Sequence, residues 1–437
     1  MTARCSNEPT MKLESLWTDT AAPFPGRSDP LPEKVDVAIV GGGFTGLSAA
    51  RAFARRGAKV VALEAGAIAA EASGRNGGHV NNGLAVDYPQ LAARVGKDRA
   101  CAWYRAYDDA VDTVERIVEA EKIDCDFERR GKLKLAARPA HYENLARNFE
   151  QLRREADPDV ELIPPERIHD EVGTDEYCGG LLYRKSAQMH MGRFGRGLAE
   201  AAAKHGALIH DHTPVERLER VSGMRYRVHT GRGVVQAGQV LVATGATRHG
   251  SVPSFWYWRR RIVPIGSFIV ATEPLPPELA AGVLKKRRTY TTTANLHNYF
   301  RLTADDRLVF GGRARFALSN PRSDAKSGEV LHRQMLAIFP QLAPVKIAYC
   351  WGGEVDMTRD RLPHAGEQDG LFYSMGYSGH GTQMSVHMGE CMARVMAGDA
   401  AANPWRDNPW SAIPGHFGPP WFLPAVGAYY RLKDMFA

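Results

Sequence analysis

The chain has no apolar run long enough to cross a bilayer, and its first residues, MTARCSNEPTMKLESLWTDT, contain no apolar core behind a basic start. We therefore expect neither a membrane-spanning helix nor a secretory signal. Cysteine is scarce, with no CxxC pair among the six present in 437 residues (Cys5, Cys101, Cys125, Cys178, Cys350 and Cys391). Scattered cysteines in a chain this long indicate reduced thiols, so the sequence predicts a cytoplasmic protein.

Several other chemistries lack the residues that they need. His205, His210 and His212 lie near one another, but no cysteine or paired carboxylate completes a metal site. The segment from Gly376 to Gly379 does not supply the G-x-S-x-G turn of a serine hydrolase. The net charge is +7, yet no nucleic-acid-binding module accompanies it. We expect no metal and no nucleic acid, and the sequence leaves the oligomeric state open.

A strand, a glycine turn, a helix and a second strand lie near the start of the chain. Val35–Val40 (VDVAIV) is a β-branched run typical of a strand buried on both faces of a parallel sheet. A helical stretch over Leu47–Arg56 follows the glycines, and Lys59–Leu63 (KVVAL) has the pattern of another buried strand. This order predicts a parallel, right-handed βαβ unit.

Gly41, Gly43 and Gly46 form G-x-G-x-x-G between that strand and that helix. The first glycine permits a tight turn, the second lets the backbone approach a diphosphate, and the third lets helix and strand pack closely. Glu64 ends the second strand, about 20 residues downstream, where a carboxylate bonds ribose hydroxyls and repels a 2′-phosphate. The unit therefore predicts a dinucleotide site for NAD or FAD.

Three further segments favour FAD over NAD. Ser73–Gly78 (SGRNGG) allows close backbone approach, and Val240–Ala246 (VLVATGA) is a buried strand that ends in a small-residue turn. Gly376–Gly381 (GYSGHG) precedes a helix whose positive dipole end would favour an anionic reduced flavin. The candidate cofactor-binding residues are Gly41, Gly43, Phe44, Thr45, Gly46, Glu64, Ala65, Ser73, Gly74, Arg75, Asn76, Gly77, Gly78, His79, Val215, Thr244, Gly245, Trp351, Gly353, Gly376, Ser378, Gly379, His380, Gly381 and Thr382.

The nucleotide-binding segments are separated by inserts of different character. Helices are expected over Asp98–Ala120 and His141–Ala156, and strands of antiparallel type over Arg261–Phe316. We predict an α/β fold, in which a discontinuous Rossmann-like domain accompanies a second domain with a mainly antiparallel sheet. The expected boundaries are 31–95, 160–250 and 350–437 for the first domain, and 96–159 and 251–349 for the second.

From Val35 to about Asp434, the chain resembles the D-amino-acid-oxidase-like family of FAD enzymes. The motifs that carry the resemblance are GGGFTGLSAA, LEAGAIAAEASGRNGGHV, LVATGA, WGGEVDMTRDRLPHAG and MGYSGHGTQ. NYFRLT, LVFGGRARF and the tail YYRLKD are most similar to the branch of γ-glutamylputrescine and L-pipecolate oxidases. The resemblance implies FAD, with an antiparallel sheet covering the flavin ring. It also implies hydride transfer from the carbon beside an amine nitrogen to flavin N5, hydrolysis of the imine, and reoxidation by oxygen with release of hydrogen peroxide.

Two positions depart from what monomeric sarcosine oxidases in this family contain. Gln383 stands where those enzymes have a lysine that binds the substrate carboxylate, so that mode of binding is in doubt. Cys350 falls close to the cysteine that carries their covalent flavin. Since a cysteine on a buried strand is ordinarily only a small apolar residue, we expect FAD to be bound non-covalently, with a link at Cys350 as the alternative.

Five side chains are candidates for contact with the substrate: His79, Tyr299, Arg301, His380 and Gln383. The histidines lie in the flavin-proximal loops, where each either sets the protonation of an amine or simply satisfies a hydrogen bond. Tyr299 and Arg301 alternate with Phe300 on one strand, so both should face the same side, either the flavin or solvent. If they face the flavin, Arg301 can bind a carboxylate with two hydrogen bonds.

The leading hypothesis is an FAD-dependent oxidase of a small amine or amino acid, such as L-pipecolate, γ-glutamylputrescine or an N-methylated amine. The alternatives are a dehydrogenase of the same fold that passes electrons to a carrier, and a flavin-binding subunit without catalysis. An NAD-dependent dehydrogenase is disfavoured because the late GYSGHG turn would have no role in it.

Overall fold

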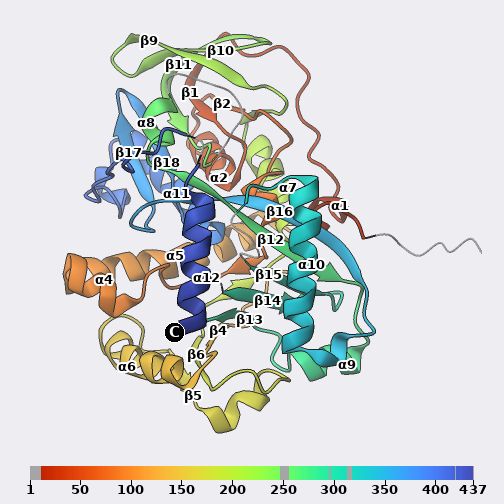
Figure 1. The fold of residues 1–437 in the computed structure, drawn as a ribbon. Helices are drawn as coiled ribbons and strands as arrows, with labels where there is room; N and C mark the ends of the chain where they lie inside the picture. Colours follow the sequence, from red (N-terminus) through yellow and green to blue (C-terminus); the bar gives the residue numbers. More distant parts are fainter. Residues whose placement is uncertain (1–10, 247–254, 295–296, 313–316, 419, 437) are drawn as a thin grey trace, which may run out of the picture.

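The computed structural model of the protein describes residues 11–246, 255–294, 297–312, 317–418 and 420–436. The first of its two large sheets is mostly parallel and lies at the top of the molecule in Figure 1. Its order is β17 (His364–Gln368), β18 (Leu371–Met375), β11 (Gly233–Val242), β1 (Lys34–Val40), β2 (Val60–Leu63) and β8 (Leu208–His210). β1 is parallel to β2 and β11, and β11 is parallel to β18. β9 (Val215–Ser222) and β10 (Arg225–Thr230) extend from β11 as an antiparallel hairpin.

The predicted βαβ unit is confirmed as β1, α2 (Phe44–Ala54) and β2. Five of the seven β1 residues, Val35 and Val37–Val40, are buried because the strand is covered on both faces. α2 packs against α7 (Met191–Lys204) and α11 (Gly381–Met396), and the α11 contact is close because Gly389 faces the α2 backbone. The start of α2 is therefore held firmly at the carboxyl end of β1.

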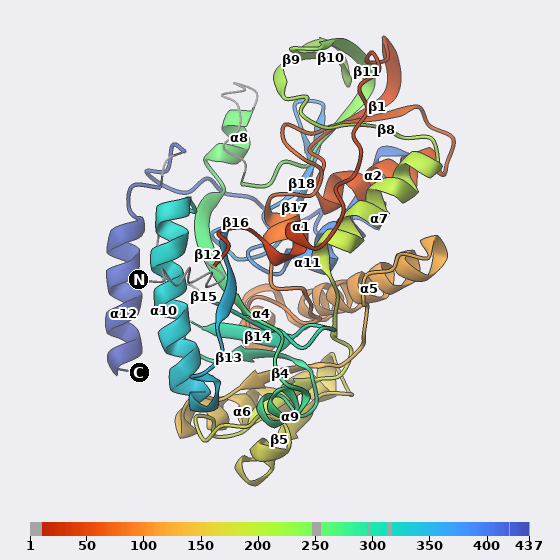
Figure 2. The same ribbon diagram turned by 90° about the vertical axis from the view of Figure 1, so that its right-hand side faces the viewer.

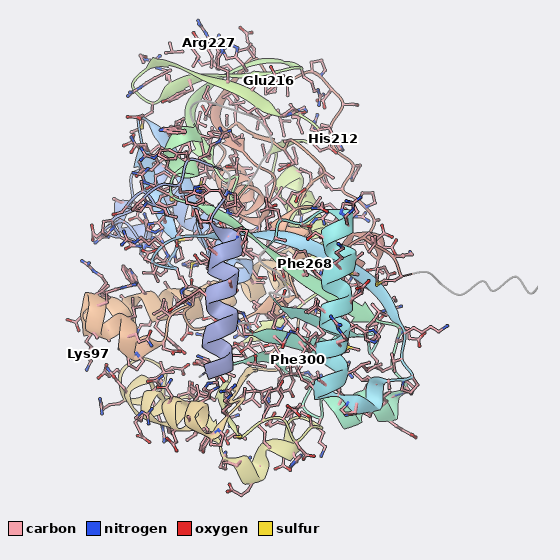
Figure 3. The ribbon with its side chains drawn as sticks, viewed as in Figure 1. Lys97, His212, Glu216, Arg227, Phe268 and Phe300 are labelled. Carbon is pink, nitrogen blue, oxygen red and sulfur yellow. The ribbon has the colours of Figure 1, made fainter. Side chains whose placement is uncertain are left out.

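The second sheet is antiparallel apart from one pair, as the sequence predicts. Its order is β16 (Ile347–Met357), β12 (Val263–Thr272), β15 (Leu308–Gly312), β14 (Asn298–Leu302), β13 (Thr289–Thr292), β4 (Lys132–Leu135), β6 (Gly180–Tyr183) and β5 (Glu161–Ile163), with β13 parallel to β4. α10 (Pro321–Ile338) packs on β12 and β16. Figure 3 shows Phe268 and Phe300 in this part of the molecule, where both are fully buried.

The strands do not follow all of the expected domain boundaries. β5 and β6 lie in the second sheet, although the sequence grouped 160–250 with the nucleotide-binding segments. β16 also pairs in the second sheet, mostly within the segment 350–437. The reason is that β6 pairs with β4 across about fifty residues, and a short buried run such as GLLY does not reveal its partner.

Helices cover the space between and around the sheets. α5 (Lys97–Glu121) runs beneath the first sheet in Figure 2 and packs against α11 and α4 (Tyr88–Val95). Arg51 of α2, which is 1% exposed, bonds Glu121 of α5 at 2.6 Å and Glu390 of α11 at 2.9 Å. The remaining elements include α1 (Leu16–Asp19), α3 (Ala72–Arg75), β3 (His79–Val80), α6 (Pro139–Glu155), β7 (Ala187–Gln188), α8 (Trp256–Arg259), α9 (Pro277–Val283) and α12 (Leu423–Phe436).

Membrane spans, cysteine pairing and metal ligands can be checked in the part of the chain that the structure describes. Within the part that the structure describes, no helix is both long and apolar enough to cross a membrane. Five cysteines are described, and all five are free thiols, whereas Cys5 lies outside the described residues. No group of three or more potential metal ligands occurs among the described residues.

Candidate active site

A cavity of about 670 Å³ lies between the two sheets. Its walls come from the carboxyl ends of β1, β2 and β11, from the segment between α3 and β3, from β12, β14 and β16, and from the start of α11. The carboxyl edge of a parallel sheet is where open α/β folds bind ligands. The volume is within the range of small-molecule and cofactor sites.

The glycine turn has the geometry that the sequence predicts. Gly41 has φ of +112°, and a Cβ there would lie 2.6 Å from the Ala243 carbonyl oxygen. A Cβ on Gly46 would lie 1.9 Å from the Gly41 carbonyl oxygen, so only glycine lets α2 approach the turn. Gly43 is the N-cap of α2 and lines the cavity together with Phe44 and Thr45. The positive end of the α2 dipole therefore faces the cavity.

Glu64 leaves the end of β2 and lines the same region. Its Oε2 accepts a hydrogen bond from the Gly42 N–H at 2.6 Å, and its Oε1 accepts one from the Gly66 N–H at 2.8 Å. Both carboxylate oxygens are thus oriented by backbone donors. A carboxylate held in this position retains acceptor capacity for ribose hydroxyls.

Most predicted cofactor residues line this one cavity although they come from seven separate segments. Besides those above, the lining includes Ala65, Ser73, Arg75, Asn76, Gly77, His79, Val215, Thr244, Gly245, Gly353, Gly379, His380, Gly381 and Thr382. Gly46, Gly74, Gly78, Trp351, Gly376 and Ser378 lie behind the lining. These residues support the cavity wall from behind. The glycines allow other segments of the backbone to approach closely, and the Ser378 hydroxyl accepts a hydrogen bond from the Thr358 N–H.

The turn before α11 is held by a carboxylate that the sequence analysis missed. Asp356 of β16 is half-buried, lines the cavity and accepts a hydrogen bond from the Gly376 N–H at 2.7 Å. Burial raises its pKa to about 6, against the opposing effect of backbone hydrogen bonds from the turn. Tyr377, also missed, bonds Thr45 of α2 at 2.8 Å. The signal for Asp356 was its two-residue spacing from Glu354 on one strand, so that both can lie at the same wall.

His79 and His380 both lie at the cavity wall, in the two loops that the sequence indicated. Among the described residues, His79 Nε2 and His380 Nδ1 are buried without a hydrogen-bond partner. Burial lowers the pKa of each imidazole to about 3, with nearby cations as further causes. Both rings are therefore neutral at ordinary pH. They can exchange hydrogen bonds with a bound molecule but are too weakly basic to hold a proton there.

Tyr299 and Arg301 of β14 do not share a role, contrary to one expectation. The Tyr299 ring lines the cavity, bonds Ser267 at 3.0 Å and meets the His79 ring edge-on at 5.4 Å. Arg301 is 3% exposed, and its guanidinium donates to the carbonyl oxygens of Gly77, Met189 and Leu302. It lies outside the lining, and each of its three nitrogens donates to a carbonyl oxygen, so the structure does not present it to a substrate carboxylate.

Of the two positions compared with sarcosine oxidases, Gln383 lines the cavity and Cys350 does not. Gln383 lines the cavity in the first turn of α11, and its amide donates to the Asn81 carbonyl oxygen. Cys350 is buried outside the lining, where its thiol donates to the Asp324 carbonyl oxygen at 3.2 Å. Burial raises the pKa of this thiol to about 12, which opposes formation of a reactive thiolate.

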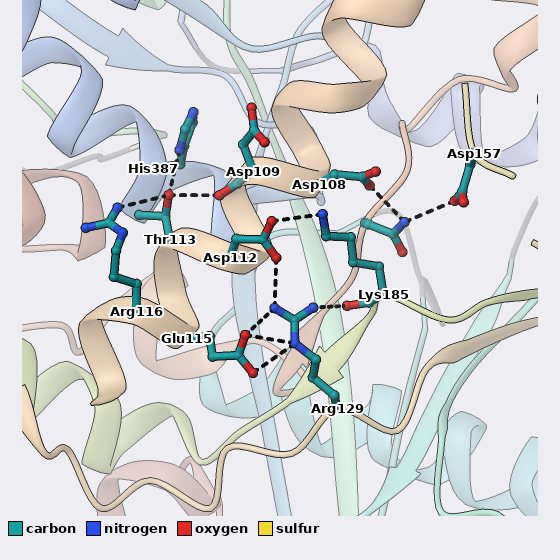
Figure 4. Close-up of polar contacts among 11 residues, drawn as sticks. Asp108, Asp109, Asp112, Thr113, Glu115, Arg116, Arg129, Asp157, Lys185 and His387 are labelled. Carbon is teal, nitrogen blue, oxygen red and sulfur yellow. Dashed lines mark hydrogen bonds and ion pairs between the residues drawn. The ribbon is translucent and has the colours of Figure 1, made fainter. Parts of the chain in front are cut away.

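A buried polar network lies behind the Asn81 wall. Lys132 donates to the Asn82 carbonyl oxygen at 2.7 Å and lies 3.9 Å from the Tyr183 ring centroid. The Asn82 side chain donates to Asp108 and approaches Asp157, two residues visible in Figure 4. Burial lowers the pKa of Lys132 to about 7, with Lys134 as a further cause.

This lowered pKa predicts a pH dependence of stability. Between pH 7 and 10.5 the unfolded lysine holds a proton that the folded one has released, so stability should rise with pH across that window. Lys132→Met removes this contribution, which amounts to at most about 1.4 kcal/mol per pH unit. Urea unfolding of both proteins at pH 7.5 and 9.5 measures the difference, in which other titrating groups cancel. If the free energy of unfolding changed equally with pH in the two proteins, the lowered pKa of Lys132 would be contradicted.

The residues at the cavity wall fit FAD. The glycine turn and the α2 N-terminus suit a diphosphate, and Glu64 suits a ribose. At the other end, a Cβ on Gly77 would come within 2.9 Å of Tyr299, so glycine keeps that space open. The buried, unpartnered nitrogens of His79 and His380 face a region where a polar ring system would supply their partners.

Comparisons with known proteins agree with this geometry. A family model described as FAD dependent oxidoreductase, DAO, matches residues 36–395. The chain is 32% identical to γ-glutamylputrescine oxidoreductase of Escherichia coli over 435 residues, covering 98% of this chain and 99% of that protein. It is 32% identical to the probable oxidoreductase OrdL of Haemophilus influenzae over 84% of both chains. The crystal structure of L-proline dehydrogenase from P. horikoshii is similar in fold, with a TM-score of 0.69 at 20% identity over 91% of this chain and 99% of that one.

Proposed function

We propose, from the premise that this chain belongs to the DAO family of FAD-dependent oxidoreductases, that its substrate is a small amine whose reacting nitrogen has no carboxylate beside it. The chain is an FAD-dependent oxidoreductase that acts on the CH–NH group of an amine or amino acid. We propose that it oxidises amines in preference to α-amino acids, and that oxygen is the electron acceptor.

The observation that carries the proposal is the charge of the described cavity wall. β16 contributes Glu354 and Asp356 to it, and Asp324 lies nearby at the start of α10. Among the described lining residues, the one lysine or arginine is Arg75, whose donors go to the Ala70 and Gly352 carbonyl oxygens. An acidic wall attracts an ammonium group and disfavours a carboxylate close to it.

The relative that matches almost the whole chain supports the same class. That protein is named for γ-glutamylputrescine, a molecule in which the free amine lies at the far end of a chain from the carboxylate. Gln383 supplies an uncharged amide near the cavity, a position suited to a neutral polar group of such a substrate. We therefore expect γ-glutamylputrescine or a similar amide-linked or simple diamine to be turned over.

The roles of the residues follow from their positions. When bound, FAD supplies the hydride acceptor for the C–H bond beside the substrate nitrogen. Tyr299, held by Ser267, and neutral His79 form one polar wall where a substrate nitrogen can be oriented by hydrogen bonds. Because His79 holds no proton at neutral pH, it does not repel an ammonium group.

An anaerobic panel tests the substrate class. Purified holoenzyme is mixed with γ-glutamylputrescine, putrescine, L-pipecolate, sarcosine and glycine, and the loss of visible flavin absorbance is followed. Fast bleaching by the first two and slow or no bleaching by the α-amino acids is expected. Preference for an α-amino acid would overturn the substrate proposal, and absence of bleaching by every compound would favour a non-catalytic flavin subunit. Peroxide release in air, compared with dye reduction under nitrogen, tests oxygen as acceptor.

His79→Gln tests the polar wall. Loss of one neutral hydrogen bond to the bound amine should lower kcat/KM by about 2- to 12-fold. The shape of the pH profile between pH 5 and 8 should not change, because the imidazole does not titrate there. His212→Gln, which changes an exposed histidine beyond β8, is the matched control. Loss of an inflection near pH 6.5 in His79→Gln would contradict a neutral imidazole.

We also propose that FAD is held without a covalent bond. The Cys350 thiol faces Asp324 and Gly328 outside the cavity lining, and its raised pKa keeps it protonated. Acid precipitation of the yellow protein should leave all of the flavin in the supernatant, and Cys350→Ser should retain FAD at the wild-type ratio. If flavin stayed in the precipitate of the wild-type protein but was released from that of Cys350→Ser, a thioether bond at this residue would be shown. Free cysteines also support residence in the cytoplasm.

A further inference from the structure

Five consecutive carbonyl groups, those of Gly74 to Gly78, are each engaged by a donor from another part of the chain. Ser15 Oγ donates to the Gly74 oxygen at 2.8 Å, and Trp351 Nε1 to the Arg75 oxygen at 2.9 Å. Trp17 Nε1 donates to the Asn76 oxygen at 2.6 Å. Arg301 Nε donates to the Gly77 oxygen at 2.9 Å, and the Met189 N–H to the Gly78 oxygen at 3.1 Å. A run of loop carbonyls satisfied in this way is fixed in direction along its whole length.

Four of these donors are buried side chains, Ser15, Trp17, Arg301 and Trp351, which we call the carbonyl clamp. The clamp residues touch one another as well as the loop. The Trp17 and Trp351 rings lie edge to face at 6.3 Å, and the Arg301 guanidinium lies 5.1 Å from the Trp17 ring centroid. The donors come from residues 11–19, which we call the N-terminal arm, and from β14 and β16, so the loop is fixed only in the folded chain.

The arm that supplies Ser15 and Trp17 is itself anchored. The Lys12 N–H donates to the Ala348 carbonyl oxygen and the Cys350 N–H donates to that of Lys12, both at 2.9 Å, so the arm pairs with β16. A Cβ on Gly192 would lie 1.9 Å from the Trp17 carbonyl oxygen, so α7 leaves room for the arm only because glycine stands there. Lys12, Ser15 and Trp17 precede the segment 36–395 that matches the family.

The other side of the clamped loop is the cavity wall. Arg75, Asn76, Gly77 and His79 line the cavity, whereas all four clamp residues lie outside the lining. A Cβ on Gly78, whose φ is +78°, would lie 2.2 Å from the Arg301 guanidinium, so loop and clamp fit closely. The clamp therefore acts on any bound molecule through the loop and not by contact.

We propose that Ser15, Trp17, Arg301 and Trp351 are positioning residues that hold the loop 74–79 in its cofactor-binding conformation before FAD arrives. The inference rests on FAD being the cofactor of this cavity. In this role Arg301 donates hydrogen bonds to backbone carbonyl oxygens and not to a substrate. The N-terminal arm then supports the cofactor site. A preformed wall binds more tightly because the ordering of the loop does not oppose binding.

Trp17→Phe is the principal test, since it removes the N–H donor and keeps an aromatic ring. FAD is stripped from the purified protein, and its Kd is measured by quenching of flavin fluorescence on re-addition. Loss of one neutral hydrogen bond should raise the Kd by about 2- to 12-fold, and Arg301→Met, which loses charged hydrogen bonds, by at least about tenfold. The double variant should weaken binding by less than the product of the two, because both act on one loop.

Trp103→Phe is the matched control. Trp103 is 3% exposed, and its Nε1 donates to the Pro404 carbonyl oxygen at 2.9 Å, away from the cavity lining. It should lower the melting temperature of the apoprotein as much as Trp17→Phe does and leave the Kd for FAD unchanged. A Kd within twofold of wild type for both Trp17→Phe and Arg301→Met, or an equal rise in Trp103→Phe, would overturn the clamp. Wild-type protein that takes up no FAD would instead refute the cofactor assignment.

Discussion

Gly46→Ala is expected to abolish stable FAD binding, raising the Kd at least about 100-fold, and to destabilise the fold by roughly 1–3 kcal/mol. The added Cβ would lie 1.9 Å from the Gly41 carbonyl oxygen and 3.2 Å from Ile39, so α2 must move away from β1. That movement takes the N-terminus of α2, with Gly43, Phe44 and Thr45, away from the diphosphate position. The flavin content after purification reports the loss of FAD binding, and urea unfolding of the apoprotein reports the loss of stability.

The direction of this effect distinguishes packing from helix propensity. Alanine is about 1 kcal/mol better than glycine inside a helix, so propensity alone would make Gly46→Ala stabilising. Gly282→Ala in α9 is the control, because a Cβ there meets nothing within 4 Å. The control should be neutral or slightly stabilising and should keep its FAD. Full flavin content in Gly46→Ala would mean that α2 does not carry the diphosphate.

Glu64→Ala has the second largest expected effect, a rise of roughly 10- to 100-fold in the Kd for FAD. The carboxylate is oriented by the Gly42 and Gly66 N–H groups, and its remaining acceptor capacity faces the cavity. Its loss removes the ribose partner and also frees two backbone donors of the turn. Flavin titration of the apoprotein measures the change.

Glu64→Gln separates the charge of the carboxylate from its shape. The amide can still accept hydrogen bonds with one oxygen, so its effect should be smaller than that of alanine. Glu143→Ala on α6 changes an exposed carboxylate and should leave the Kd unaltered. Equal affinities for wild type and Glu64→Ala would show that the ribose is held elsewhere.

The dinucleotide half of the site could be predicted from the amino-acid sequence. Strand β1, the glycine turn, α2, β2 and Glu64 are contiguous, so hydrophobic pattern and glycine spacing are sufficient to predict them. The late turn before α11 was found for the same reason, since a cluster of glycines followed by a helical pattern is a local signal, and Gly376 and Gly379 indeed have positive φ.

The roles of side chains at the second sheet depend on contacts that form only when the chain folds. The two-residue alternation placed Tyr299 and Arg301 on one side of β14, but the Gly77 carbonyl draws the Arg301 guanidinium behind the loop while the Tyr299 ring reaches the cavity. Asp356 and Trp17 gained their roles from partners 20 and 59 residues away, in other elements of the fold. Periodicity reports which face a residue occupies. The direction of a long polar side chain depends on which donors and acceptors folding brings near it, and those lie far away in the sequence.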